Sequence, residues 1–136
     1  MILYRLYNIG EQFSAYSTDG LFSGCVRQVF WNELPTPWND SGFSDIPIER
    51  YLSGEEGCYR FAFTYEQLAG LLDKLARFTL NKYESAALRR IVVRLVEVPD
   101  RHVMQGAHQV IYRAEAATVH TTSRPLDKLM PISIAA

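Results

Sequence analysis

Acidic and aromatic side chains are concentrated in residues 32–57, and these residue types suit contact with a basic protein surface. The segment holds six acidic side chains against one basic side chain. Aromatic rings supply a large contact area at low entropic cost, and carboxylates supply charge complementarity. The alternative is that the rings pack into the core and leave the carboxylates in solvent. We predict that a partner protein is bound by Glu33, Trp38, Asp40, Phe43, Asp45, Glu49, Tyr51, Glu55 and Glu56.

A second set of candidate residues is arginine in the middle of expected strands. If several of these side chains point the same way, they form a basic face that could hold phosphate or an acidic protein. The alternative is that they face solvent and pair with Glu97, Glu115 or acids in the loops. The set consists of Arg5, Arg27, Arg60, Arg94 and Arg113.

Other chemistry finds little support in the sequence. The three histidines, His102, His108 and His120, have no compact metal-binding spacing, and Cys25 and Cys58 lie far from them. A nucleophile elbow, a phosphate-binding glycine loop and a dinucleotide fingerprint are all missing from the sequence. We therefore expect no catalytic residue, no metal ion and no cofactor.

The elements that must position these residues are clearest between Cys58 and Val98. Residues 58–63 alternate aromatic and small or polar side chains, which predicts a strand. Thr64-Tyr-Glu-Gln67 matches a capping box, and leucines at helical spacing follow it. We expect a main helix from Tyr65 to about Leu80 and a second short helix from Asn81 through Leu88. Residues 91–98 are rich in β-branched side chains and predict another strand.

Further strands are expected at 2–7, 24–31 and 109–113. Both faces of residues 2–7 are largely apolar, so this strand should be central in the sheet. Residues 109–113 are expected to lie beside 91–98. Together these elements predict an α+β fold in which a mixed sheet of four or five strands is packed by one main helix. A βαβ-like crossover is favoured, with antiparallel pairing as the alternative.

Length and composition indicate one globular domain covering residues 1–136, with 32–57 as a long acidic and aromatic loop within it. Residues 1–57 hold eight acids and three bases, whereas residues 58–136 hold seven acids and eleven bases. One half could meet a basic partner and the other an acidic one. The alternative is that the two halves face each other or that their charges scatter over the surface. The sequence pI near 6.3 argues against direct nucleic-acid binding. With no signal peptide and no long apolar run, we expect a cytoplasmic protein that does not enter membranes.

Three short motifs resemble small uncharacterised proteins of phages and prophages. They are Leu3-Tyr4-Arg5, the run from Arg60 to Leu68, and Val96-Glu-Val-Pro99 followed by Gly106-Ala-His-Gln-Val-Ile111. The resemblance implies an accessory protein of a mobile element. Inhibitors of bacterial defence, such as anti-CRISPR proteins, are frequent in that group.

A second resemblance is to ADP-ribosyltransferase-like enzymes. It rests on Arg5 in the first strand and on the pair Ser17-Thr18. Where such enzymes carry a catalytic glutamate on a late strand, this sequence offers Gln109 or Glu115, without a Glu-x-Glu or Gln-x-Glu motif. The resemblance implies either an enzyme that anchors a nucleotide phosphate on Arg5 or a degenerate relative of such an enzyme.

The leading functional prediction is a non-enzymatic protein-binding module that inhibits a bacterial defence complex by occlusion. Its partner could carry a basic surface that binds nucleic acid, with the carboxylates of residues 32–57 imitating phosphates. Two alternatives remain open: the ADP-ribosyltransferase-like enzyme and a structural subunit of a homo-oligomer. The oligomer would present an apolar patch on its sheet.

Overall fold

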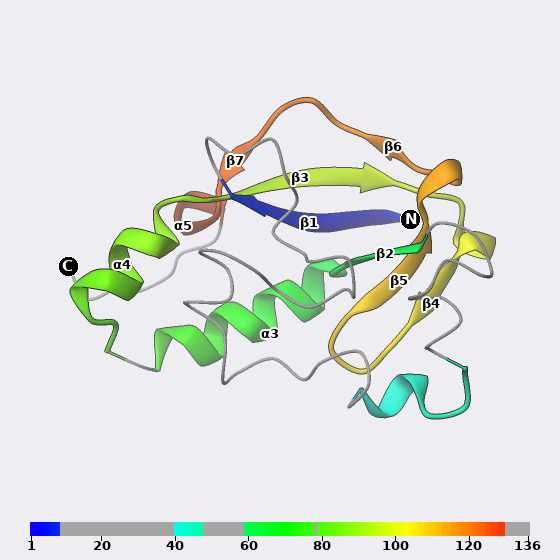
Figure 1. Cartoon of the computed structure of the whole chain (residues 1–136), viewed down its shortest axis with the longest axis horizontal. Coiled ribbons are helices and arrows are strands. Elements are labelled where there is room, and N and C mark those ends of the chain that lie inside the picture. Colours follow the sequence, from blue (N-terminus) through cyan, green and yellow to red (C-terminus); the bar gives the residue numbers. More distant parts are fainter. Residues whose placement is uncertain (9–39, 48–58, 78, 130–136) are drawn as a thin grey trace.

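A computed structural model describes residues 1–8, 40–47, 59–77 and 79–129 (Figure 1). The predicted strand at 24–31 lies outside these residues. The described strands form two antiparallel sheets, and helices accompany them, so the predicted α+β class is confirmed.

The first sheet is built on β1 (Ile2–Asn8) and β3 (Ile91–Glu97), which pair antiparallel along their whole length. On its other side β3 pairs with two short strands, β6 (Thr118–Val119) and β7 (Arg124–Pro125). The second sheet has the order β2 (Tyr59–Ala62), β5 (Val110–Arg113), β4 (Val103–Gln105). All described pairs are antiparallel, and β2 and β3 do not pair with each other, so the described residues contain neither the expected mixed sheet nor the parallel crossover.

β1 connects the two sheets. Tyr4 and Phe63 exchange backbone hydrogen bonds, with N···O distances of 2.8 and 2.9 Å. β1 therefore has neighbours on both sides, which confirms the expectation of a central strand. The prediction that residues 109–113 lie beside residues 91–98 is wrong. After β3 the short helix η3 (Asp100–His102) leads into the β4–β5 hairpin, which pairs with β2 instead.

The main helix α3 (Tyr65–Ala76) begins at the predicted capping box and packs against β1 (Figure 1). Its buried face contains Leu68, Leu71 and Leu72. The short helix α4 (Lys82–Leu88) begins with the expected reciprocal bonds between Asn81 and Glu84, 2.8 and 3.1 Å long. Two further 3₁₀ turns, η2 (Ser41–Phe43) and η4 (Ala114–Ala116), and a final helix α5 (Leu126–Leu129) complete the described elements.

Two clusters of buried residues lie on the two faces of the second sheet. Between the sheets, Leu3 and Val96 pack with Ala62, Val110 and Tyr112. On the outer face of the second sheet, Phe43 packs with Phe61 and Ile111. The segment that carries η2 therefore covers the face of the sheet opposite β1.

Candidate functional site

The described part of the acidic and aromatic segment, residues 40–47, is anchored to the β4–β5 turn through Asp40. The Asp40 carboxylate accepts hydrogen bonds from the backbone N–H groups of Gly42, Ala107 and His108 at 2.9, 2.6 and 3.0 Å. Its side chain is 2% exposed. Three amide donors satisfy a buried carboxylate, so Asp40 fastens η2 to the hairpin.

The same turn is fastened to the start of α3 by Gln67. The Gln67 side-chain oxygen accepts the Thr64 amide hydrogen, and the Thr64 hydroxyl accepts the Gln67 amide hydrogen, which completes the capping box. The Gln67 side-chain amide also donates to the carbonyls of Gly106 and Gln109, at 2.9 and 3.4 Å. Helix, hairpin turn and acidic segment are thus joined in one polar network.

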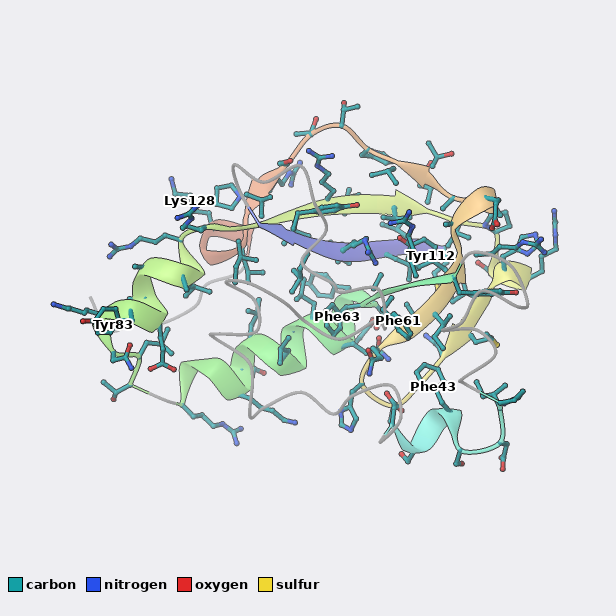
Figure 2. All side chains as sticks on the ribbon, viewed as in Figure 1. Phe43, Phe61, Phe63, Tyr83, Tyr112 and Lys128 are labelled. Atoms are coloured by element: carbon teal, nitrogen blue, oxygen red, sulfur yellow. The ribbon has the colours of Figure 1, made fainter. Side chains whose placement is uncertain are left out.

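The backbones of η2 and the β4–β5 turn approach each other closely at this junction, and the approach depends on two glycines. A Cβ on Gly42 would lie 2.5 Å from the Gly106 Cα, and a Cβ on Gly106 would lie 2.6 Å from the Phe43 ring. Figure 2 shows Phe43 directed from η2 toward the strands of the second sheet. It is 3% exposed and packs with Phe61 and Ile111.

The structure describes three members of the predicted partner-binding set, Asp40, Phe43 and Asp45. Asp40 and Phe43 are buried, because the first satisfies backbone donors and the second fills the outer core. For Phe43 the alternative of packing into the core is the correct one. Asp45 is exposed two residues beyond Phe43. Six other members of the set lie outside the described residues: Glu33, Trp38, Glu49, Tyr51, Glu55 and Glu56.

The four described members of the predicted arginine set are divided between the two sheets, and Arg27 lies outside the described residues. Arg5 and Arg94 face each other across the β1–β3 pair, and both guanidinium groups lie near the Tyr7 ring, at 5.8 and 5.0 Å from its centroid. The Arg94 Nε also donates to the Ser123 hydroxyl at 2.9 Å. Arg113 lies on β5 and pairs with Glu115 at 3.4 Å, as the alternative expected. Arg60 on β2 is exposed.

Arg5 is a structural side chain in this fold. It is 3% exposed and donates to the backbone carbonyl of Phe61, which links β1 to β2. Burial raises the pKa of Tyr112 above its ordinary value, and the nearby Arg5 guanidinium offsets part of that rise. A buried arginine that holds two strands together is poorly placed to anchor a nucleotide phosphate.

The candidate late-strand residues of the enzyme hypothesis are also used within the fold. Gln109 is buried, and its carbonyl accepts from Gly106 at 2.7 Å. Glu115 is exposed and pairs with Arg113. The pair Ser17-Thr18 of that hypothesis lies outside the described residues.

Two expectations about metals and membranes can be compared with the described part of the chain. Within it, no three His, Cys, Asp or Glu side chains are grouped closely enough to hold a metal ion. His120 instead lies 3.7 Å from Glu97. Every helix in the described ranges is too short or too polar to cross a membrane.

A protein-family model described as "Bacteriophage T4 Y00F protein" matches residues 1–126 of the 136-residue chain. The chain belongs to this family. The predicted resemblance to small phage-encoded proteins is therefore confirmed, and the family description says nothing of anti-CRISPR activity. Comparison with curated proteins and with solved structures found no match.

Sequence reasoning missed the residues that build this junction. Gly42, Gly106 and the second role of Gln67 depend on contacts between positions about 40 to 65 residues apart in the chain, which no local pattern records. One signal was available: Asp40-Ser-Gly42 is typical of a turn in which an aspartate accepts from the amide two residues on.

Proposed function

We propose that this phage protein is a non-enzymatic protein-binding module that inhibits a bacterial defence complex, in the manner of an anti-CRISPR protein, by occluding a basic surface. The observation that carries the proposal is the anchoring of residues 40–47. Asp40 and Phe43 fix this stretch to the second sheet, while Asp45 remains exposed. A segment fixed in this way presents its charge at a defined place, which lowers the entropy lost on binding.

The proposed contact residues are the members of the predicted partner-binding set that do not hold the segment in place. Asp40 and Phe43 hold the segment, and the contact residues are Glu33, Trp38, Asp45, Glu49, Tyr51, Glu55 and Glu56. For all of them except Asp45 the assignment rests on the sequence. The carboxylates would speed encounter with a basic target and imitate the phosphates of its nucleic acid, and the rings would supply apolar anchors.

The ADP-ribosyltransferase-like alternative has less support. Its key residue, Arg5, is buried against the Phe61 carbonyl, and Glu115 is occupied by Arg113. The homo-oligomer alternative stays a prediction, and size-exclusion chromatography across a range of protein concentrations is its direct test.

The test of the proposed function begins with capture of the target. Tagged protein is exposed to lysate of a bacterium with active defence systems, at low and high salt, and the captured complex is purified and its activity measured. We expect a stoichiometric partner whose activity is inhibited and whose affinity falls as salt rises, because exposed charge pairs are screened.

Matched variants then locate the contact. The variant D45N/E49Q/E55Q/E56Q removes four acids from the segment, and we expect it to weaken binding at least about tenfold. The control E66Q/D73N/E97Q/D100N removes four exposed acids elsewhere and should change affinity about twofold or less. Equal losses of affinity in both variants would show that net charge alone drives binding. That result would overturn the assignment of the contact to the acidic segment.

A further inference from the structure

One end of the molecule carries exposed basic side chains from three elements. α4 supplies Lys82 at its first position and Arg89 and Arg90 just after its last. β7 supplies Arg124, and α5 supplies Lys128. All five side chains are exposed. We call this set, Lys82, Arg89, Arg90, Arg124 and Lys128, the basic end.

The fold brings Arg90, Arg124 and Lys128 to the same end of the first sheet, although they lie far apart in the sequence. Arg90 immediately precedes β3, and the first part of β3 pairs with β7, Val93 opposite Arg124. α5 follows β7 directly and contacts both β3 and β7. Figure 2 shows Lys128 close to the place where α4 leads into β3, and Tyr83 on α4 at the same end.

Among the side chains that the structure describes, no carboxylate pairs with the basic end, and the side chain of Asp127 in α5 lies outside them. Glu84, the acid within α4, instead accepts the Asn81 amide hydrogen at 3.1 Å as part of the capping box. Like charges gathered in this way repel each other, so their clustering indicates an anionic ligand.

Helix electrostatics explain only part of the cluster. Arg89 and Arg90 follow the carboxyl end of α4, where cations are favourable. Lys82 lies at the amino end of the same helix, where a cation is unfavourable, and Arg124 lies in a strand. A shared ligand accounts for all five positions.

The surroundings of the basic end favour nucleic acid over an acidic protein. Protein interfaces usually have an apolar centre. Among the described residues, the large apolar side chains exposed on the surface are Met1, Ile2, Tyr65, Tyr83 and Val119, and of these only Tyr83 belongs to an element of the basic end. Nucleic-acid contacts need arginine, lysine and hydroxyl groups at phosphates, and an exposed ring for an unpaired base. Three exposed hydroxyl residues, 121–123, directly precede Arg124.

We infer that the basic end binds the phosphate backbone of nucleic acid, with the Tyr83 ring available to stack on an unpaired base. Tyr83 is 67% exposed, and the Lys82 ammonium lies 5.4 Å from its ring centroid. The sequence pI of about 6.3 predicts the opposite, because it averages this surface with the acids of residues 1–57. The inference concerns a different surface from the acidic segment and is independent of the proposed function.

Fluorescence anisotropy of the full chain with a labelled single strand of about 20 nucleotides and with the matching duplex tests the inference. We expect sequence-independent binding with Kd between about 10⁻⁴ and 10⁻⁶ M at physiological salt, weakening steeply as salt rises. The variant R89Q/R90Q/K128Q should weaken binding at least about tenfold and should reduce the slope of log K against log salt for the duplex by about 2 to 3.

Two control variants sharpen the result. R60Q/R101Q/R113Q removes three positive charges from β2, η3 and β5, away from the basic end, and should weaken binding about twofold or less. Tyr83→Leu should weaken binding of the single strand about fivefold and leave the duplex unchanged, because only an unpaired base can stack.

Three outcomes would overturn the inference: no binding at low salt, equal losses in the two triple variants, or displacement of the DNA by polyglutamate at equal charge concentration. The last result would assign the basic end to an acidic protein. Thermal unfolding of each variant checks its folding. If the triple variant fails to fold, the single changes R124Q and K128Q are measured in the same way, and unchanged affinity in both would equally overturn the inference.

Discussion

Gly106 sits among three groups that leave no room for a side chain. A Cβ there would lie 2.6 Å from the Phe43 ring, 2.7 Å from the Asp40 carboxylate and 2.8 Å from the Gln109 carbonyl. Its own N–H and C=O are both used, by Gln109 and Gln67. At the scale of single residues, the attachment of the acidic segment therefore depends on the absence of a side chain at Gly106 as much as on the hydrogen bonds of Asp40.

Gly106→Ala should lower the free energy of unfolding by about 1–3 kcal/mol, because a well-packed site must shift to admit the methyl group. Gly70→Ala is the matched control. Nothing lies within 4 Å of its Cβ position on α3, so this change should raise stability by up to about 1 kcal/mol. Urea unfolding of both variants measures the difference, and a Gly106→Ala protein as stable as the parent would refute the close packing described at the turn.

At the scale of elements, α3 and α4 begin with the same kind of cap but differ in what the cap touches. The side chains of Asn81 and Glu84 each accept the backbone N–H of the other residue at an exposed helix end. Thr64 and Gln67 make the equivalent bonds, and Gln67 also reaches the β4–β5 turn. The start of α3 therefore connects the helix to the β4–β5 turn, whereas the start of α4 only caps its own helix.

This difference predicts unequal effects of removing the two caps. Gln67→Ala should destabilise the protein by about 2 kcal/mol, since it leaves the half-buried Gly106 carbonyl without its donor in addition to losing the cap. Glu84→Ala should cost about 0.5 kcal/mol, because its bond lies in solvent. Chemical unfolding midpoints compare the two, and equal losses would contradict the role given to Gln67.

At the scale of the whole molecule, β1 belongs to both halves of the structure. It pairs with β3 over seven residues and with Phe63 through the bridge at Tyr4, while Leu3 packs against the second sheet. Arg5 adds a bond from β1 to the Phe61 carbonyl. The bridge from β1 and the cluster between the sheets therefore connect the two sheets, which should couple their unfolding.

Hydrogen exchange should therefore show one cooperative unit. We expect the amides of Val93 in the first sheet and Ile111 in the second to open with free energies equal within about 1 kcal/mol, because β1 pairs with β3 and contributes Leu3 to the cluster between the sheets. Mass-spectrometric exchange of the intact protein under native conditions gives both values. A second sheet that opens several kcal/mol more easily than the first would show that the sheets are independent.

The distribution of charge is also a property of the whole molecule. The net charge of −1 combines an acid-rich half of the sequence with a base-rich half. The fold gathers part of the second half into the basic end and fastens part of the first half onto the second sheet. Two surfaces of opposite charge can then contact different ligands, which the average charge conceals.

The sequence by itself determined the local elements. The alternation at 59–63, the capping boxes at Thr64 and Asn81, and the β-branched run at 91–97 each depend on neighbouring residues, and each formed as predicted. The α+β class follows from that order of elements. Only the tertiary structure decided the pairing of strands, the burial of Arg5, Asp40 and Phe43, and the contact of α5 with β3 and β7. The physical reason is that these contacts join residues far apart in the chain. Periodicity and capping depend on neighbouring residues, so they do not show which distant segments pack against each other.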